Sequence, residues 1–363
     1  MVQKPEARTD VVRLARPDVG EEELAEIREV LESGQLTMGP KVAEFEALLA
    51  DAAGTDHAVA VSSGTAALHV AVLALGIGPG DEVLVPAYTF PATANVVALV
   101  GATPVLVDVD PVTMNMDPAE AARRVTPRTK AVLAVHLFGR PARVEELPEL
   151  PILEDAAGAL GATHGGRACG SLGELGCFSF HPRKIVTTGE GGAVSTNDGA
   201  LAERVRSLRH HGWSPSDSYE DMPKAAFNYR LSDVLCALGI PQLRRLDELR
   251  SAYERVAAGY AERLAGLDVV LPGADPGDRH GLQAYVIQVD RRDDVMAGLR
   301  AQGIQCQIGT YALHRLGAYR GQGSFPGADA AFERALALPL HARLSDAELD
   351  RVAEALDNLV SSH

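Results

Sequence analysis

Apolar residues recur every three or four positions in two segments near the start of the chain, residues 21–33 and 41–53. This spacing places them along one side of a helix and predicts two amphipathic helices. A glycine follows each segment, as is typical where a helix has ended. In the first helix, the side chains expected on the buried face are Leu24, Ile27, Val30 and Leu31.

From residue 58 onward, short apolar runs alternate with helix-like stretches. The runs that we interpret as strands cover residues 58–61, 82–85, 104–107, 131–135, 152–153, 176–180 and 193–195. The helical stretches between them include residues 65–75, 92–100 and 118–124. Such alternation predicts a mostly parallel sheet of about seven strands with helices on both faces, and such sheets bind ligands at the carboxyl ends of their strands.

The last third of the chain has a different pattern. Residues 232–264 form one long helical region, which proline should kink or break at residues 239–241 because it has no backbone donor. Beyond it we expect a small α+β unit with strands at 284–289 and 304–308, a helix at 293–302 and a last helix after residue 344, which begins with a capping box formed by Ser345 and Glu348.

The chain therefore predicts two domains, a large one over residues 1–242 and a small C-terminal one over residues 243–363. Its 363 residues, 46% of them hydrophobic, are enough for a sizeable core. A formal net charge of −15 argues against nucleic acid or an anionic membrane as the main partner. No apolar run approaches the length of a membrane span, and the first residues contain no apolar signal segment.

The cysteines and histidines point to no metal. The four cysteines form no CxxC pair and have no spacing suited to zinc, so we expect reduced, mostly buried thiols and a cytoplasmic location. The adjacent histidines at 210 and 211 are best explained as surface or internally satisfied residues, since no carboxylate spacing accompanies them.

Lys184 is the first candidate for chemistry. Only five of the 34 basic residues are lysines, so a lysine is kept where arginine would not serve. A lysine amine can lose its proton when desolvated and attack a carbonyl, which predicts a Schiff-base lysine. It lies between a buried strand and the glycine-rich turn at residues 189–192. The alternative is a solvated loop lysine beside a hairpin turn.

Two further features lie at strand ends. Residues 62–67, SSGTAA, join a strand to a helix, where Gly64, Thr65 and free backbone amides could bind a phosphate. Asp155 follows the strand at 152–153. Each could equally be an ordinary helix cap. Together with Lys184 they make the set that pyridoxal phosphate needs: a lysine for its carbonyl, a carboxylate for its ring nitrogen and a helix end for its phosphate.

Several motifs, in this order, carry a resemblance to a known family: SSGTAAL, PAYTFPATANVV, GATPVLVDVD, VHLFGRP, EDAAGALGA, GCFSFHPRKIVTTGEGGAV and FNYRLSD. The chain resembles the DegT/DnrJ/EryC1/StrS family of sugar aminotransferases from about residue 34 to residue 339. The resemblance implies an α/β, aspartate-aminotransferase-like architecture, pyridoxal-phosphate fold type I. Its large domain would contain a mostly parallel seven-stranded sheet, beside a small C-terminal α+β domain.

The resemblance also implies roles in cofactor binding. Lys184 would bind the cofactor covalently and act as general base, and Asp155 would pair with the pyridine nitrogen. Phe90 would stack on the cofactor ring, although a plain core aromatic is the alternative. Asn228 would contact the phosphate in the neighbouring subunit, so that each active site would need a homodimer. The residues expected to hold the phosphate in their own subunit are Gly64, Thr65, Ala66 and Ser179.

The substrate residues are less closely matched to the family. Arg183 stands where a small hydroxyl residue is common, and it could bind a substrate phosphate or carboxylate or face solvent. Gly158 replaces the usual glutamine near the cofactor hydroxyl, so that hydrogen bond must come from elsewhere or be lost. Arg230 could bind substrate or make a structural ion pair. The other substrate candidates are His181 beside the cofactor loop, and Tyr311 and His314 in IGTYALH, where the family tends to carry tyrosine, proline, leucine and histidine.

The function predicted from the resemblance is transfer of an amino group, from L-glutamate, to a keto-sugar linked to a nucleotide. Four alternatives remain. A dehydratase of the family would have histidine in place of Lys184, and a regulator would bind the cofactor without catalysis. Some relatives aminate cyclitols instead of sugars. An unrelated α/β binding module would need no cofactor.

Overall fold

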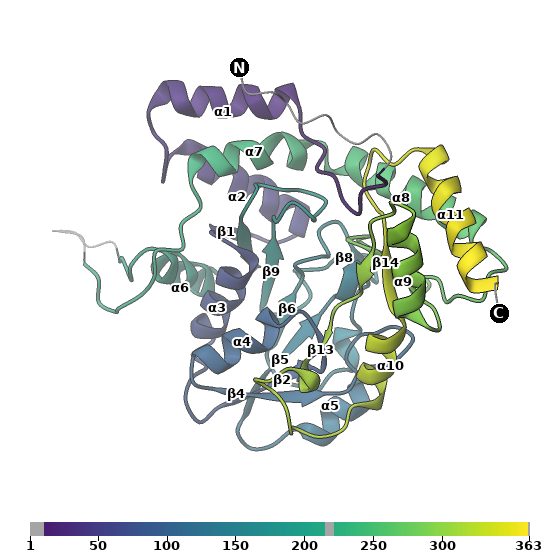
Figure 1. Ribbon diagram of the computed structural model, residues 1–363. Helices are drawn as coiled ribbons and strands as arrows, with labels where there is room; N and C mark the ends of the chain where they lie inside the picture. Colours follow the sequence, from purple (N-terminus) through teal and green to yellow (C-terminus); the bar gives the residue numbers. More distant parts are fainter. Residues whose placement is uncertain (1–10, 215–220, 362–363) are drawn as a thin grey trace.

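A seven-stranded sheet forms the centre of the computed structural model, which describes residues 11–214 and 221–361 (Figure 1). The strand order is β1-β10-β9-β6-β5-β2-β4, and β10 alone runs antiparallel to its neighbours. The seven strands expected from the sequence are thereby confirmed. Their bounds are β1 His57–Val61, β2 Glu82–Pro86, β4 Thr103–Val107, β5 Thr129–Val135, β6 Ile152–Asp155, β9 Leu175–Ser179 and β10 Gly192–Thr196.

Helices cover both faces of this sheet because its strands are apolar on both sides. In β1, Ala58 and Ala60 belong to one core cluster, while Val59 and Val61 belong to another, as the two-residue period of a strand requires. The helices of this part are α1 Glu21–Ser33, α2 Pro40–Ala53, α3 Gly64–Ala74, α4 Ala92–Leu99, α5 Pro118–Arg124 and α6 Gly199–Arg209.

Helix α1 differs from the expectation in what it buries. Its bounds are as predicted, but Leu24 and Leu31 are 53% and 59% exposed, and the buried residues are Glu23 and Val30. The carboxylate of Glu23 accepts a hydrogen bond from the Gly20 N–H (2.6 Å) and pairs with Arg245 at 3.2 Å, which permits its burial. The predicted buried face of α1 is therefore confirmed at Val30 and wrong at Leu24 and Leu31.

The long C-terminal helical region also breaks at another point. Helix α7, Asp233–Arg244, continues through Pro241, and the break comes at Arg245, before α8, Leu246–Arg263. The glycine at 239 has a packing role, since a Cβ there would lie 2.5 Å from the Phe45 ring of α2. Gly239 thus allows a close contact between α7 and α2, and the predicted interruption at residues 239–241 is wrong.

The C-terminal residues form a second, three-stranded sheet with order β11-β14-β12. Ser345 and Glu348 make the predicted capping box, with each side chain bonded to the other's backbone N–H (3.3 and 2.9 Å). The strand expected at 304–308 is confined to its last two residues. The elements here are β11 Tyr285–Gln288, α9 Arg292–Ala301, β12 Gln307–Ile308, β13 Tyr311–Ala312, α10 Pro326–Arg334, β14 Ala335–Leu338 and α11 Asp346–Ser361.

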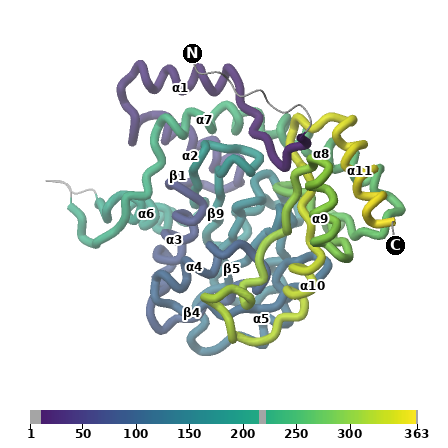
Figure 2. Tube along the Cα trace, in the orientation of Figure 1, coloured from purple at the N-terminus to yellow at the C-terminus, as the bar shows by residue number. Residues whose placement is uncertain are grey.

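The two parts of the chain are joined through their cores and through backbone pairing. Both large hydrophobic clusters contain side chains from before and after residue 243, and β13 pairs with β3, Tyr88–Thr89, of the first part. Figure 2 shows the N-terminal segment beside the C-terminal elements, where Val12 bridges to Ile304. The domain boundary near residue 243 stays a prediction. In the part of the chain that the structure describes, no helix has the length and apolar character to cross a membrane.

Candidate active site

A cavity of about 430 Å³ lies at the carboxyl ends of β5 and β6, and both parts of the chain line it. One wall, which we call the sheet wall, consists of Ser63, Gly64, Thr65, Asp155, Ser179 and Lys184. The opposite wall, the C-terminal wall, consists of Gln283, Gln307 and Tyr311. The three features that the sequence singled out therefore meet in one place, as expected for strand ends of a parallel sheet.

Lys184 is held by the loop between β9 and β10. Its N–H donates to the His181 carbonyl (2.8 Å), which folds residues 181–184 into a turn after the strand end. The loop closes at Gly189, whose φ of +81° lies in the left-handed region and explains the glycine. The predicted tight turn before β10 is confirmed.

Gln242 of α7 holds this loop in place through two hydrogen bonds. Its Oε1 accepts from the Thr187 N–H (3.0 Å), and its Nε2 donates to the Thr187 carbonyl (2.8 Å). Gln242 is buried, and a buried amide bonded at both ends holds a loop in one conformation. Sequence reasoning missed this residue, because a glutamine inside a helix carries no signal of its contacts.

The environment of Lys184 favours a neutral amine. Burial lowers the pKa of Lys184 to about 8; Asp155 opposes this shift and the Arg183 guanidinium adds to it. The amine makes no hydrogen bond within the described residues. An unbonded, half-buried lysine of lowered pKa on a cavity wall is suited to attack a carbonyl, so the solvated loop lysine no longer explains this position.

Asp155 is the last residue of β6 and is buried, at 6% exposed. Its Oδ2 accepts from Thr93 Oγ1 (2.8 Å), and its Oδ1 accepts from the Ala157 N–H (3.2 Å). Burial raises the pKa of this carboxyl, and its hydrogen bonds and the charges of Lys184 and His136 offset that rise only in part. No α-helix begins at Asp155, which removes the helix-cap alternative. Its carboxylate makes no ion pair among the described residues and is available to a protonated group bound in the cavity.

The neighbouring Glu154 points away from the cavity and anchors the strand end. Its buried carboxylate accepts from the N–H groups of Gly170, Leu172 and Gly173 (2.6 to 2.8 Å) and pairs with His136 Nε2 at 2.8 Å. His136 Nδ1 accepts from the Ala142 N–H (2.9 Å), so Nε2 carries the proton that it donates to Glu154. Asp155 is thus positioned by a fully bonded neighbour.

The turn between β1 and α3 forms a cradle for an anion. Ser63 caps α3, its Oγ accepting from the Ala66 N–H (3.1 Å), which leaves the amides of Gly64 and Thr65 at the helix N-terminus. A Cβ on Gly64 would lie 2.8 Å from Ser179 Cβ, so glycine allows the helix end to approach Ser179. Ala66 is buried and does not line the cavity; its predicted phosphate contact stays a prediction.

Two aromatic rings stand at the cavity mouth. Phe90 is 61% exposed, and its ring lies edge-on to Tyr311 with the centroids 6.3 Å apart. The pairing of β3 with β13 sets Tyr311 opposite Thr89 and so brings the two rings together. An exposed phenylalanine on a cavity is no core residue, which removes the packing alternative for Phe90 and leaves its ring free for a planar ligand.

Arg183 reaches across the cavity to the C-terminal wall. Its Nη1 donates to Gln307 Oε1 (3.0 Å), and within the described residues no carboxylate pairs with it. Its Nε is buried without a partner, and burial lowers the pKa of the guanidinium. A half-buried cation with a neutral partner is an incomplete ion pair. His181 also lines the cavity and is exposed.

Three predicted residues besides Ala66 lie outside this cavity. Asn228 bridges to His210 near α6, and Arg230 Nη1 bonds His210 Nδ1 at 2.7 Å. No carboxylate in the part of the chain that the structure describes pairs with Arg230. His314 Nε2 lies 3.0 Å from Asp329 Oδ1. The structure thus brings Lys184, Asp155, Gly64, Thr65, Ser179, Phe90, His181, Arg183 and Tyr311 together.

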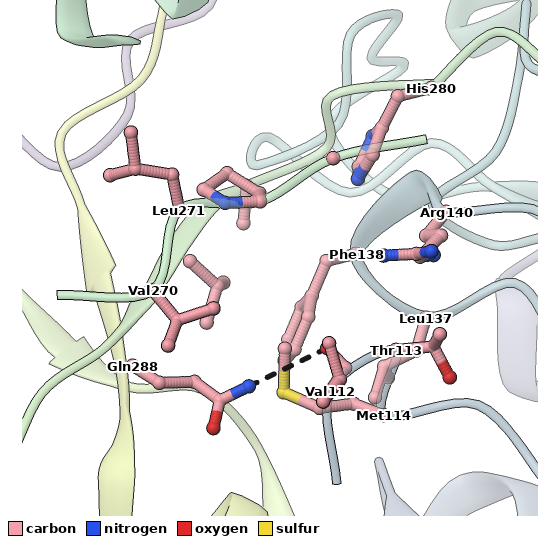
Figure 3. A pocket seen from close by; sticks show the side chains of 14 residues that line it. Val112, Thr113, Met114, Leu137, Phe138, Arg140, Val270, Leu271, His280 and Gln288 are labelled. Carbon is pink, nitrogen blue, oxygen red and sulfur yellow. Dashed lines mark hydrogen bonds between the residues drawn. The ribbon is translucent and has the colours of Figure 1, made fainter. Parts of the chain in front are cut away.

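A second hollow, of about 20 Å³, lies beside the first and shares Leu137, Phe138 and Ala284 with it (Figure 3). Its lining is mainly apolar, and Gln288 Nε2 spans it to the carbonyls of Pro111 (2.9 Å) and Val112 (3.5 Å). This volume suits one water molecule, so the larger cavity is the candidate active site. Among the described residues, no group of histidine, cysteine, aspartate or glutamate could hold a metal ion.

Comparisons with known proteins agree with this geometry. The model of the DegT/DnrJ/EryC1/StrS aminotransferase family matches residues 17–357. GDP-perosamine synthase of Caulobacter vibrioides is 42% identical over 339 residues, which cover 89% of this chain and 91% of that one.

Two solved structures extend the comparison. The aminotransferase TlmJ from Streptoalloteichus hindustanus superimposes with a TM-score of 0.93 and 35% identity over 97% of this chain and 99% of its own. The PLP-form of Spr1654 from Streptococcus pneumoniae has a TM-score of 0.93 and 30% identity over the same shares.

The fold and the site together define a pyridoxal-phosphate-dependent aminotransferase of fold type I. The chain belongs to the DegT/DnrJ/EryC1/StrS aminotransferase family, as its motifs predicted. The cavity fits this cofactor on its own chemistry: a reactive amine, a buried carboxylate that makes no ion pair among the described residues, and a helix end that glycine keeps open toward Ser179.

Proposed function

We propose that this enzyme transfers the amino group of L-glutamate to the keto group of a nucleotide-linked sugar. The observation that carries the proposal is that Lys184 and Asp155 face one cavity together with the Ser63–Thr65 turn. Pyridoxal phosphate, when bound there, supplies the carbonyl that accepts the amino group and the ring that takes up electrons from the donor α-carbon.

The residues of the sheet wall would divide the work. Lys184 Nζ would bind the cofactor covalently and, once displaced by the donor, carry the proton from the donor α-carbon. Asp155 would hold a proton on the ring nitrogen, and Thr93 and the Ala157 N–H orient its carboxylate for that purpose. Thr65, Ser179 and the amides at the start of α3 would bind the phosphate.

Arg183 would recognise the amino donor. It lies beside Lys184 in the chain, points into the cavity and has Gln307 as its neutral partner. An α-carboxylate would complete this ion pair, and arginine offers two parallel donors to a carboxylate. The proposal of an amino acid as donor rests on this unpaired cation.

The acceptor would be a keto-sugar linked to a nucleotide. The cavity, at about 430 Å³ and open at the Phe90–Tyr311 pair, has room for a sugar beside the cofactor, and the exposed rings could stack on a flat group outside it. The similar protein from Caulobacter is a GDP-perosamine synthase by name, which supports a nucleotide-linked substrate. The unpaired, buried cysteines support a cytoplasmic location.

We further propose that the enzyme is a homodimer whose active sites are shared. Asn228 lies away from the cavity of its own chain, as a residue that serves the partner's site must. The exposed Leu24 and Leu31 lie two turns apart on one face of α1, which offers an apolar surface for a second copy.

Mixed dimers would test this sharing. Inactive Lys184→Ala chains mixed with Asn228→Ala chains should regain up to about a quarter of wild-type activity, since random pairing yields half mixed dimers with one intact site each. No recovery after confirmed subunit exchange would contradict shared sites.

The first test of the function is the absorbance spectrum of the protein with pyridoxal phosphate, before and after L-glutamate. We expect a visible band that glutamate converts to the spectrum of the aminated cofactor. A keto-sugar nucleotide should then restore the first band. A band that ignores glutamate would refute this donor, and absence of any band would refute the site.

A further inference from the structure

Three glycines meet where the C-terminal part of the chain crosses the end of β6. A Cβ on Gly139 would lie 2.7 Å from the Leu282 nitrogen, and one on Gly281 would lie 3.2 Å from the Gly158 oxygen. Gly139 also has a φ of +97°, which side chains rarely adopt. We call Gly139, Gly158 and Gly281 the glycine junction.

Backbone hydrogen bonds hold the crossing segment in this junction. The Gly281 N–H donates to the Gly139 carbonyl (2.8 Å), and the Gln283 N–H donates to the Phe138 carbonyl (3.0 Å). His280 stabilises the bend of this segment, because its Nδ1 accepts a hydrogen bond from the Leu282 N–H (2.9 Å). Figure 3 shows His280 on the same side as Arg140. Residue 283 is therefore placed by its backbone, independently of its side chain.

The Gln283 side chain lies directly against Gly158 and lines the active-site cavity. A Cβ on Gly158 would be 3.1 Å from both Cβ and Cγ of Gln283 and 3.4 Å from its Oε1. Gly158 has no positive φ, so its backbone conformation is not what calls for glycine. A side chain at 158 would crowd Gln283, and glycine leaves that space to the Gln283 side chain.

The carboxamide of Gln283 has no hydrogen-bond partner within the described residues. A half-buried amide without a partner on a cavity wall is available to a ligand. Once Lys184, Asp155 and the Ser63–Thr65 turn take the carbonyl, ring nitrogen and phosphate of the cofactor, its ring hydroxyl is the one polar group still lacking a partner. This step rests on the proposed roles of those residues.

We propose that Gln283 is a cofactor-positioning residue, whose carboxamide crosses from the C-terminal part to hydrogen-bond the ring hydroxyl of pyridoxal phosphate from the place that a side chain at 158 would occupy. The amide N–H is a donor to a negatively charged oxygen, so it stabilises the ionised hydroxyl. Gln283 thereby supplies, from another part of the chain, the hydrogen bond that Gly158 cannot make.

The test is a pH titration of the absorbance of the bound cofactor, a readout that does not depend on turnover. Replacing Gln283 by Met keeps the length but removes the donor, and should raise the titration midpoint by about one pH unit. Gln283→Glu should raise it further, because a carboxylate repels the ionised hydroxyl. An unchanged midpoint in both variants would overturn the proposal.

An exchange of the two residues sharpens the test. Gly158→Gln alone should lower the melting temperature of the cofactor-free protein, since its side chain meets Gln283 at 3.1 Å. Gly158→Gln combined with Gln283→Gly transfers the carboxamide from residue 283 to residue 158. The midpoint of the cofactor titration should then return toward the wild-type value. A folded double variant with the midpoint of Gln283→Met would contradict the exchange.

Gln288→Met is the matched control, since it makes the same change at another glutamine of the C-terminal part, one that lines the second hollow and not the active-site cavity. Its midpoint should stay at the wild-type value. An equal shift in Gln288→Met would mean a general effect of substitution in the C-terminal part and would refute a specific bond from Gln283. If the Gln283 variants still bind cofactor and react with glutamate, the proposed function stands whichever way the midpoint moves.

Discussion

The two walls of the active-site cavity differ in how their residues reach it. The sheet wall is built from residues at or just beyond strand ends. The parallel pairing of β6 with β9 places Asp155, and the antiparallel pairing of β9 with β10 places Ser179. The C-terminal wall is built from residues in a crossing segment and short strands, placed by the glycine junction and by β3–β13 pairing. We infer that the first wall holds the reacting groups common to the class, while the second positions the cofactor through Gln283 and adapts the site to particular ligands.

The largest effect should come from the sheet wall. Lys184→Ala removes both the covalent attachment and the proton carrier, so transamination should fall by about 10⁴-fold or more. The visible band of the lysine-bound cofactor should vanish while the far-UV circular dichroism stays unchanged. Turnover near the wild-type rate would show that Lys184 is not catalytic and would contradict the assignment of the reacting groups to the sheet wall.

The second effect concerns the other charged group of that wall. Asp155→Asn keeps the shape but cannot stabilise a proton on the ring nitrogen, so the rate of the glutamate half-reaction should fall about 10²- to 10³-fold. Thr93→Val, which removes one hydrogen bond to Asp155, should cost much less. Single-turnover kinetics would measure the half-reaction rate of both variants. An equal loss of rate in Asp155→Asn and Thr93→Val would contradict this prediction.

Arg183 joins the two walls, and its loss should affect donor binding. Arg183→Gln should raise the glutamate KM about 10- to 100-fold with a smaller change in kcat, as expected for a charge-assisted hydrogen bond. Arg315→Gln is the control, because Arg315 is paired with Asp329 and Glu333 away from the cavity. If only the KM for the sugar rises, Arg183 binds the acceptor and not the amino donor.

The pH dependence of cofactor attachment follows from the lowered pKa of Lys184. The amine attacks only when neutral, so the attachment rate of the cofactor-free protein should rise about tenfold per pH unit below about 8 and level off above it. Arg183 lowers this pKa and Asp155 raises it. The midpoint of this pH dependence should therefore move up in Arg183→Gln and down in Asp155→Asn. Stopped-flow absorbance would measure the attachment rate, and a shift in the opposite direction in either variant would contradict the prediction.

The smallest effect should come from the cavity mouth. Tyr311→Ala removes one ring of the Phe90 pair and should raise the KM of the sugar about threefold to tenfold, leaving the glutamate half-reaction unchanged. A slowed glutamate half-reaction would place Tyr311 in the chemistry and would break the division between the walls.

The sequence alone determined most of the fold and the sheet wall. Short apolar runs alternating with helical segments specify a parallel sheet, because each pattern fits one kind of element, and all seven strands are present. Strand ends in such a sheet lie at one edge, so the positions of Lys184, Asp155 and the residue 62–67 turn along the chain are enough to predict that they share one site. Those motifs also identified the family and its cofactor.

Only the tertiary structure decided which helix faces are buried and what forms the second wall. The apolar spacing of α1 could not show that Glu23 finds a partner in Arg245, more than 200 residues away, and is buried while Leu24 is exposed. Nor could local pattern link Gly158 to Gln283 or Arg183 to Gln307. These contacts form only where backbone segments that are distant in the sequence meet. The hydrophobic period of a segment indicates whether it is a helix or a strand, but not which segments it packs against.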